Sequence, residues 1–385
     1  MLLPLLALAL GAFGLGTTET IVMGLLPELS GSLGVSIAQT GLLVSGYAIG
    51  VTVASPVIAI LTRNYTRRAT LLLMMGLFVI GNTFSGIAPN YWLLMAARII
   101  TSLSHGTFYG AASVMASQLV PPDKRANALS LVYIGLTLSM ILGVPLGTLI
   151  AQYSSWRLAF GMITMIGLIS WGAIYFLIPQ DKMSGPTVKL YAQLEAIKQP
   201  LVLTVMLVSM FTSASMFALF TYITPFLQNR IGLSPHGVAL VLLLIGIGLC
   251  LGNLLGGRLA DWKMLPSCAG MMLAVAIVEL ALVPGSRQMW PCIILLFLWG
   301  MFIYAPMAPL QSYVVTASGA SPNIASAVNQ SSFNFGNAVG AWAGSLIISA
   351  GASYAEIPVV AAAFAIGGCL LVCLAMRPEK IKTPL

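Results

Sequence analysis

One carboxylate, Glu19, lies inside an apolar stretch at the start of the chain. It is the only Asp, Glu, Lys or Arg from residue 1 to residue 27, and about 20 apolar residues suffice to cross the roughly 30 Å hydrocarbon core of a bilayer. An ionisable group at that depth is costly unless it faces a bundle interior or a water-filled cavity, which favours a role in carrying a proton or cation. The alternative is a neutral, protonated Glu19 that hydrogen-bonds a neighbouring helix.

A second charge, Arg98, is predicted at a matching depth in a later apolar segment. Glu19 is eight residues, roughly 12 Å, from Pro27 at the end of its segment. Arg98 is six residues, roughly 9 Å, from Trp92 at the start of its own. Paired opposite charges keep the carboxylate ionised, whereas loss of the partner or arrival of an apolar ligand favours protonation. This predicts a central site where proton and ligand compete, with an Arg98 that only joins helices as the alternative.

Two more titratable residues fall inside apolar segments. His105 is close to the expected bilayer centre and could relay protons, because histidine titrates near neutral pH; a packing role is the equal alternative. Glu279 lies in the apolar segment 265–284, where a structural or interfacial role is favoured over proton coupling. The proton-coupling candidates are therefore Glu19, Arg98 and His105.

Uncharged amides recur at helical spacing near the end of the chain. Gln330, Asn334 and Asn337 stand at i, i+4 and i+7, so they share one helix face and could hydrogen-bond a neutral or weakly polar ligand. The alternative is that they bind neighbouring helices together. Tyr222 could add an aromatic wall and Gln311 a further hydrogen-bond donor. The candidate substrate-binding residues are therefore Tyr222, Gln311, Gln330, Phe333, Asn334 and Asn337.

The composition identifies a polytopic membrane protein. Of 385 residues, 59% are hydrophobic and 7% are charged, against about a quarter charged in soluble domains. The net charge of +8 comes from short basic clusters between apolar segments, which argues against nucleic-acid binding. The chain has no Gly-rich loop followed by Lys-Ser or Lys-Thr for ATP, and its two histidines and few acids form no catalytic or metal cluster. We therefore expect no enzyme activity, no metal and no cofactor, with a proton gradient as the energy source.

The order of apolar segments predicts an all-α fold of twelve transmembrane helices in two pseudo-symmetric six-helix bundles. The segments are residues 3–27, 38–61, 69–87, 92–118, 127–150, 156–178, 200–227, 236–259, 265–284, 289–315, 324–349 and 356–376. Basic residues concentrate in the loops on one side, which places both termini in the cytoplasm.

The chain divides at one long polar connection. The predicted units are an N-terminal bundle (1–178), a cytoplasmic linker with a short amphipathic helix (179–199) and a C-terminal bundle with a short tail (200–385). Residues 47–63 align with residues 245–261, and residues 142–150 with residues 339–347, at an offset near 200. Such a repeat indicates a duplicated six-helix unit with a binding site at the midplane between the halves.

Several motifs resemble one known family. They are Thr17-Thr-Glu19 with Gly24-Leu-Leu-Pro27, Arg98 with His105-Gly106, and Gly143-Val-Pro145-Leu-Gly147-Thr148. They resemble the major facilitator superfamily, and within it the twelve-span drug:proton antiporter branch that includes bacterial arabinose, sugar, purine-nucleoside and chloramphenicol exporters. The resemblance implies proton coupling through Arg98, and a conformational antiporter motif at Gly143, Pro145 and Gly147.

One loop departs from the family pattern. Residues 61–68 include Arg67 and Arg68 but lack the acidic residue usual between the second and third helices, while the second copy keeps Gly257 and Asp261. The family resemblance implies that this loop latches one conformation through a carboxylate at a helix end. The contact made by the loop of residues 61–68, the first latch, is then expected to be the weaker one. The contact made by its second-half copy with Gly257 and Asp261, the second latch, is expected to dominate.

The sequence thus predicts a proton-coupled exporter of small molecules, of the drug or multidrug efflux kind with amphenicol-like or related substrates. It is expected in the inner membrane of a bacterium, where it works by alternating access. The alternatives are a sugar or purine-nucleoside exporter, a proton-independent facilitator or importer, and a non-transporting receptor. The expected partners are the substrate, protons and lipid, with no nucleic acid, and the chain is expected to act as a monomer.

Overall fold

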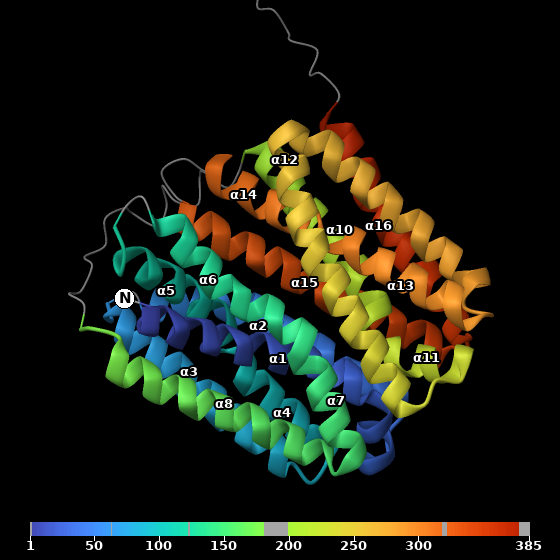
Figure 1. Ribbon diagram of the computed structural model, residues 1–385, viewed down its shortest axis with the longest axis horizontal. Coiled ribbons are helices and arrows are strands. Elements are labelled where there is room, and N and C mark those ends of the chain that lie inside the picture. The colour runs from blue at the N-terminus through green and yellow to red at the C-terminus, as the bar shows by residue number, and fades with distance from the viewer. Residues whose placement is uncertain (1, 63, 122–123, 181–198, 318–321, 377–385) are drawn as a thin grey trace, which may run out of the picture.

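Long helices that run between two ends of one bundle make up the computed structural model (Figure 1), which describes residues 2–62, 64–121, 124–180, 199–317 and 322–376. No strand occurs in these ranges. The helices of the first half are α1 (Leu2–Leu33), α2 (Ile37–Leu61), α3 (Arg67–Ile87), α4 (Tyr91–Ser102), α5 (His105–Gln118), α6 (Arg125–Leu138), the π-helix η2 (Ser139–Gly143), α7 (Val144–Tyr153) and α8 (Trp156–Leu177). Those of the second half are α10 (Pro200–Phe220), α11 (Ile223–Ile231), α12 (Pro235–Gly285), α13 (Met289–Tyr304), α14 (Met307–Ala317), α15 (Pro322–Ser349), the short 3-10 helix η3 (Tyr354–Glu356) and α16 (Ile357–Ala375).

Ten helical segments in the described ranges are long and apolar enough to cross a membrane. The remaining two predicted spans are also helical. One is divided into α4 and α5, and the other is α15, whose amides lower its hydropathy. All twelve predicted spans therefore correspond to helices, and the all-α fold class is confirmed.

Polar residues at the turns fix where helices start and stop. Ser36 and Gln39 form a reciprocal capping box at the start of α2, in which each side chain accepts a hydrogen bond from the other residue's backbone N–H. Gly232 ends α11 with a φ of 64°, a left-handed conformation that glycine adopts without steric cost. These caps satisfy backbone groups that would otherwise lie unpaired at the helix ends.

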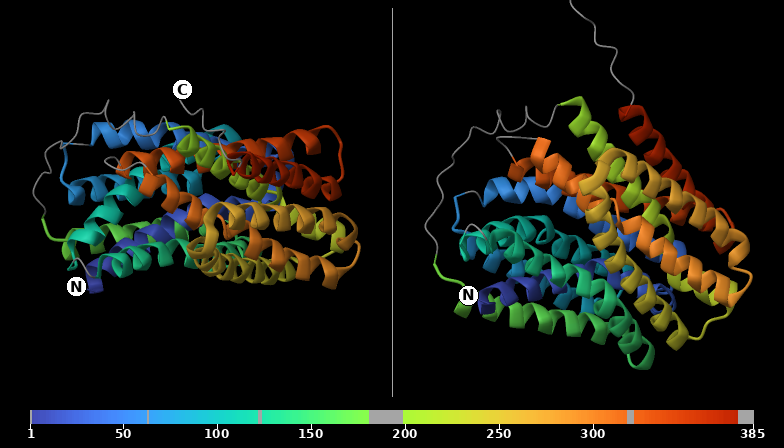
Figure 2. Two further views of the ribbon diagram at one scale, coloured as in Figure 1. Left: turned by 90° about the horizontal axis from the view of Figure 1, so that it is seen from above. Right: turned by 45° about the horizontal axis from the view of Figure 1, so that its top comes forward.

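The two halves of the chain lie on two sides of the molecule. In Figures 1 and 2 the blue-to-green helices α1–α8 gather on one side and the yellow-to-red helices α10–α16 on the other. The predicted linker helix lies outside the described residues, and the predicted domain boundaries at 178 and 199 stay a prediction. We call the end where α1 begins the near end, and the end where α1 stops the far end.

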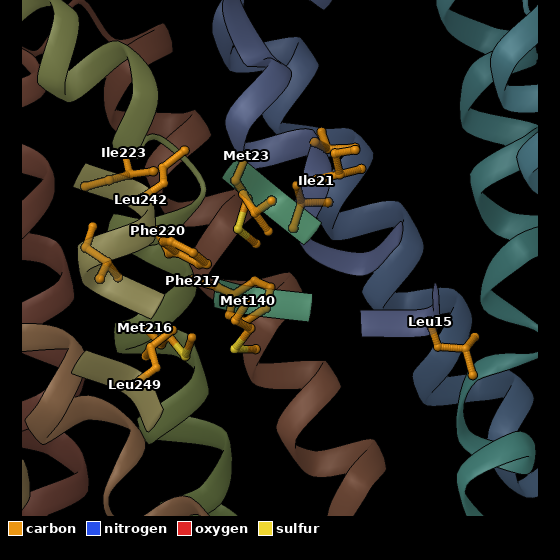
Figure 3. Packing of buried hydrophobic residues seen from close by; sticks show 14 of the residues in the cluster. Leu15, Ile21, Met23, Met140, Met216, Phe217, Phe220, Ile223, Leu242 and Leu249 are labelled. Carbon is orange, nitrogen blue, oxygen red and sulfur yellow. The ribbon is translucent and has the colours of Figure 1, made fainter. Parts of the chain in front are cut away.

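The halves are in close contact toward the far end. Ser345 Oγ of α15 donates to the carbonyl oxygen of Ala38 in α2 at 3.0 Å, and Ser45 Oγ donates to the carbonyl oxygen of Ala338 at 3.1 Å. Buried apolar side chains from both halves also meet in one cluster, as Figure 3 shows for Met23, Met140, Met216, Phe217 and Phe220. The bundle is therefore closed at the far end.

A small groove opens on the surface where the two halves meet. It has a volume of about 170 Å³ and lies between α6–η2 and α12. Its lining residues are Ile134, Thr137, Leu138, Ile141, Cys250, Asn253 and Leu254. The contact between α2 and α15 also continues toward the near end, where Ser331 Oγ donates to the carbonyl oxygen of Thr52 at 3.2 Å.

Candidate functional site

The Glu19 carboxyl group lies between the two halves of the protein. Its side chain is buried, its Oε2 is 3.8 Å from His105 Nε2 of α5, and its Oε1 accepts a hydrogen bond from Asn337 Nδ2 of α15 at 3.2 Å. One residue of each half therefore contacts the carboxyl group that the sequence singled out. The structure brings Glu19, His105 and Asn337 together.

Arg98 holds α1 through its backbone. The guanidinium Nη1 donates to the carbonyl oxygen of Thr18 at 2.6 Å and to Thr18 Oγ1 at 3.1 Å, and Nη2 donates to the carbonyl oxygen of Glu19 at 3.4 Å. Both residues are described, and no ion pair joins the guanidinium to the Glu19 carboxylate. The predicted direct charge pair is therefore not formed in this conformation, and the terminal nitrogens of the guanidinium group bond instead to Thr18 and to the main chain of α1.

Tyr47 of α2 links Arg98 to His105. Its ring lies 4.2 Å from the Arg98 guanidinium carbon, a cation–π contact, and its hydroxyl is 3.0 Å from His105 Nδ1. A neutral His105 that accepts the tyrosine proton at Nδ1 carries its own proton on Nε2, on the side of Glu19. The chain Tyr47–His105–Glu19 thus fixes the orientation of the imidazole.

The sequence interpretation missed Tyr47 as a site residue. Tyr47 opens the repeated segment whose second-half counterpart begins with Ile245, and this polar departure from the repeat is the signal that could have found it. Tyr109 was missed as well: its hydroxyl donates to the carbonyl oxygen of Ala12 at 3.0 Å, and its ring stacks on that of Tyr133 with centroids 6.0 Å apart. The Tyr109 ring also lies beside His105, with ring centroids 5.2 Å apart.

A break between α4 and α5 positions His105. The backbone N–H groups of Leu103 and Ser104 donate to Ile100 and Thr101, three residues back, and Ser104 Oγ also donates to the carbonyl oxygen of Thr101 at 2.7 Å. These tight turns interrupt the α-helical ladder. His105 therefore begins a new helix.

Helix α15 presents three different faces. Ser331 and Ser345 contact α2, with Ser331 Oγ donating to the carbonyl oxygen of Thr52 at 3.2 Å. Gly336 and Gly340 face α10: a Cβ atom at Gly340 would lie 2.2 Å from the carbonyl oxygen of Ala214, so only glycine permits this approach. Exposed aromatic and aliphatic side chains form the outer face, namely Phe335, Trp342 and Leu346.

The predicted amide stripe lies between the faces toward α2 and α10. Asn334 and Asn337 are 1% and 5% exposed, and Asn334 Nδ2 donates to the carbonyl oxygen of Gln330 at 3.0 Å. The side-chain oxygens of both asparagines accept no hydrogen bond within the described residues. Buried acceptors without a donor are costly, so these two oxygens are suited to a ligand that donates hydrogen bonds.

The other predicted binding residues lie apart from Glu19. Gln311 bonds within the second half, where its Nε2 donates to Ser326 Oγ and its Oε1 accepts from Asn329 Nδ2, each at 2.6 Å. Tyr222 donates to the carbonyl oxygen of Ala341 at 2.9 Å, and Phe333 packs in a second apolar cluster. The structure does not join these three to the carboxyl group.

The predicted conformational motif packs against α1. A Cβ atom at Gly143 would lie 2.2 Å from Thr17 Oγ1, and one at Gly147 would lie 2.3 Å from Ile21 Cδ1. Pro145 comes directly after the π-helix η2 and Val144. Because proline has no N–H, it interrupts the α-helical hydrogen-bond ladder at this point.

The two predicted latches lie at the near end. Arg67 and Arg68 open α3, and Gly257 is exposed in α12. The Asp261 side chain lies outside the described residues. Among the described residues no group of three or more His, Cys, Asp or Glu side chains could hold a metal ion.

Comparison with known proteins places this architecture in a family. A family model described as Major Facilitator Superfamily matches residues 8–323. The inner membrane transport protein YdhP of Escherichia coli strain K12 is 40% identical over 376 residues, which cover 98% of this chain and 96% of that protein. A probable sugar efflux transporter of Pasteurella multocida is 30% identical over 97% of this chain and 94% of its own length. The crystal structure of the human organic anion transporter MFSD10 (TETRAN) has the same fold, with a TM-score of 0.74 at 15% identity over 96% of this chain and 99% of that one.

The fold, the buried polar centre between two helical halves and these matches define a multi-pass membrane transport protein. The chain belongs to the major facilitator superfamily. The family predicted from the sequence motifs is confirmed.

Proposed function

We propose that the protein is a proton-coupled exporter of small molecules, with Glu19 as the proton-binding group. The observation that carries the proposal is the position of its carboxyl group, which contacts His105 of the first half and Asn337 of the second. A protonation change at this point alters a contact between the halves. That is what a coupled alternating-access cycle requires.

The proton can act through the Asn337 hydrogen bond. An ionised Glu19 accepts from Asn337 Nδ2, whereas protonation removes the charge and weakens that bond. A hydrogen bond to a charged group contributes about 1.5–3 kcal/mol, which corresponds to a roughly ten- to hundredfold shift between two conformations. Protonation of Glu19 therefore favours separation of the halves at this level.

A substrate can compete with the proton at the same place. It would reach the centre between the halves, where the unpaired oxygens of Asn334 and Asn337 accept hydrogen bonds from it. A further donor on the substrate, directed at the Glu19 carboxylate, would stabilise its ionised form and so oppose protonation. Substrate and proton then occupy the site in different phases of the cycle.

We further propose that the near end is cytoplasmic, with both termini inside, because Arg67, Arg68, Lys124, Arg125 and Arg258 lie there. The contact at the far end then closes the extracellular side in this conformation. The name of the Escherichia coli relative supports the bacterial inner membrane as the location. Amphenicol-like or related drugs are the first substrate class to test. Sugars are the second, favoured by the name of the Pasteurella multocida relative.

The test is substrate-driven proton movement in proteoliposomes that contain a pH-sensitive dye. Amphenicols, sugars, nucleosides and lipophilic cations are added in turn to vesicles with the wild type, with Glu19→Gln, or with the exposed-site control Glu356→Gln. We expect one class to drive protons in the opposite direction in the wild type and the control, but not in Glu19→Gln. Substrate flux without proton movement in the wild type would instead identify a facilitator.

A further inference from the structure

A second carboxyl group, that of Glu279 in α12, is buried in the second half. It is 0% exposed. Ser215 Oγ of α10 lies 2.9 Å from Oε1 and 3.2 Å from Oε2, and Trp299 Nε1 of α13 donates to Oε1 at 2.9 Å. One carboxyl group thus connects three helices.

The first half contains a similar connection at equivalent positions. Thr18 Oγ1 of α1 donates to Asn82 Oδ1 of α3 at 2.6 Å and accepts from Arg98 Nη1 of α4 at 3.1 Å. Thr18 and Ser215 are 197 residues apart, as are Asn82 and Glu279, and this matches the offset between residues 142–150 and 339–347 of the sequence repeat. The duplicated unit therefore uses the same place for a polar node. The node contains a cation in the first half and a carboxyl group in the second.

Within the part of the chain that the structure describes, no cation contacts the second node. The helices that pack around this part of α12 are α10, α13 and α16, and they contain no Asp, Glu, Lys, Arg or His. Their titratable groups, together with the cysteine of the same part of α12, are Cys268, Cys292, Tyr304, Cys369 and Cys373. None of them is hydrogen-bonded to Glu279 in the described residues.

The charged groups of the remaining neighbours lie elsewhere. Arg230 of α11 donates through Nε to Ser286 Oγ at 3.3 Å, and Ser286 is about two helical turns, roughly 10 Å, beyond Glu279. Glu356 in η3 and Arg125 at the start of α6 are exposed. Within α12 itself, His236, Arg258, Asp261 and Lys263 stand at least sixteen residues before Glu279.

A buried carboxylate without a cation is expensive, because neutral donors offset only part of the lost hydration. A neutral acid avoids this cost and keeps every contact. Its Oε1 accepts from Trp299, and its Oε2–H can donate to Ser215 Oγ. We propose that Glu279 is a second proton-binding site, which holds its proton throughout the transport cycle and fastens α10, α12 and α13 to one another.

The test is infrared spectroscopy of the purified full-length protein, because a protonated carboxyl group has a C=O stretching band that a carboxylate lacks. Spectra of the wild type, Glu279→Gln and Glu19→Gln are compared from about pH 5 to about pH 9, where exposed acids are ionised. We expect a band that persists at the alkaline limit in the wild type and in Glu19→Gln, and that is missing from Glu279→Gln. A wild type without such a band, or a band unchanged in Glu279→Gln, would overturn the proposal.

Two further measurements guard against a folding defect and separate this proposal from the role of Glu19. Trp299→Phe removes one donor to Oε1, so the band should move to higher frequency while the acid stays protonated; an unmoved band would contradict the assignment. Glu279→Gln should keep the wild-type number of protons moved per substrate. A lower number would mean that the Glu279 proton is transported. The infrared result does not depend on any transport activity, so it stands or fails separately from the proposed function.

Discussion

Arg98 forms hydrogen bonds to carbonyl oxygens of α1, in addition to placing a positive charge near Glu19. Its guanidinium group reaches Thr18 and Glu19 from α4 and stacks on Tyr47. A planar, forked donor can make these contacts together, whereas a lysine ammonium group cannot. The residue therefore sets the position of the Glu19 backbone relative to α4.

Arg98→Lys should lower the stability of the protein. The loss of buried hydrogen bonds from a charged donor costs about 1.5–3 kcal/mol, to be measured as a lower melting temperature in detergent. Arg157→Lys is the matched control, since Arg157 also donates to a carbonyl oxygen, that of Ala88 at 3.0 Å, but at a partly buried site. Equal effects of the two substitutions would mean that the buried contacts of Arg98 have no special weight.

Tyr47→Phe should change the pH profile of transport. It removes the hydroxyl that contacts His105 Nδ1 but keeps the ring over Arg98, so the imidazole loses the partner that fixes its orientation. Tyr109→Phe is the control, because it removes a hydroxyl bonded to the carbonyl oxygen of Ala12. Each variant should lose about 1 kcal/mol of stability, but only Tyr47→Phe should shift the profile; a shift of equal size in both would count against the Tyr47–His105 contact.

Single residues whose charge is unusual in a membrane could be recognised from the sequence. Glu19, Arg98 and His105 stand out in apolar segments, and helical spacing was enough to pick out Asn337. Gln311 bonds to Asn329, eighteen residues later, through the packing of α14 on α15, and its role in substrate binding stays a prediction. Spacing along one helix cannot reveal a partner on another.

Several predicted helices are divided in the structure, and proline explains most of the divisions. Pro145 follows η2, Pro225 follows the break between α10 and α11, and Pro306 lies between α13 and α14; each removes a backbone donor from the helical ladder. The break between α4 and α5 contains no proline or glycine, so the sequence carries no signal for it. Apolar runs therefore predicted where helices lie but not where they are interrupted.

The packing of α15 on α10 depends on glycine. Gly340→Val should destabilise the protein by about 1–3 kcal/mol or more, because the new Cβ atom would meet a backbone carbonyl oxygen at 2.2 Å, which cannot rotate away. Gly172→Val in α8 is the control, since a Cβ atom there meets nothing within 4 Å. The yield of monodisperse protein and its melting temperature measure the difference. Similar values for both variants would show that α15 can move away from α10 at little cost.

For the whole molecule, the contact between the halves at the far end must open if transport uses alternating access. Ala38 and Ser345 lie in this contact, joined by a hydrogen bond of 3.0 Å. After replacement of the five native cysteines, the pair Ala38→Cys and Ser345→Cys should form a disulfide under oxidising conditions. Oxidation should block transport, and a reductant should restore it.

A disulfide within one half provides the control for the Ala38–Ser345 disulfide. Gly86 of α3 and Gly161 of α8 are close, since a Cβ atom at Gly86 would lie 3.9 Å from the Gly161 nitrogen. The pair Gly86→Cys and Gly161→Cys should therefore form a disulfide that leaves transport intact. Full transport by the oxidised Ala38–Ser345 pair would show that the halves do not separate at the far end.

Helix α15 lies between the Glu19 carboxyl group and the outer surface of the bundle. Phe335, Trp342 and Leu346 point outward, while Asn337 on another face of the same helix reaches the Glu19 carboxyl group. An α-helix with its side chains is about 10–12 Å across, so the outward-facing side chains and the Glu19 carboxyl group are separated by roughly one helix diameter. The lateral pressure and thickness of the bilayer thus act directly on the element that closes the centre, and we expect the transport rate to vary with the lipid used for reconstitution.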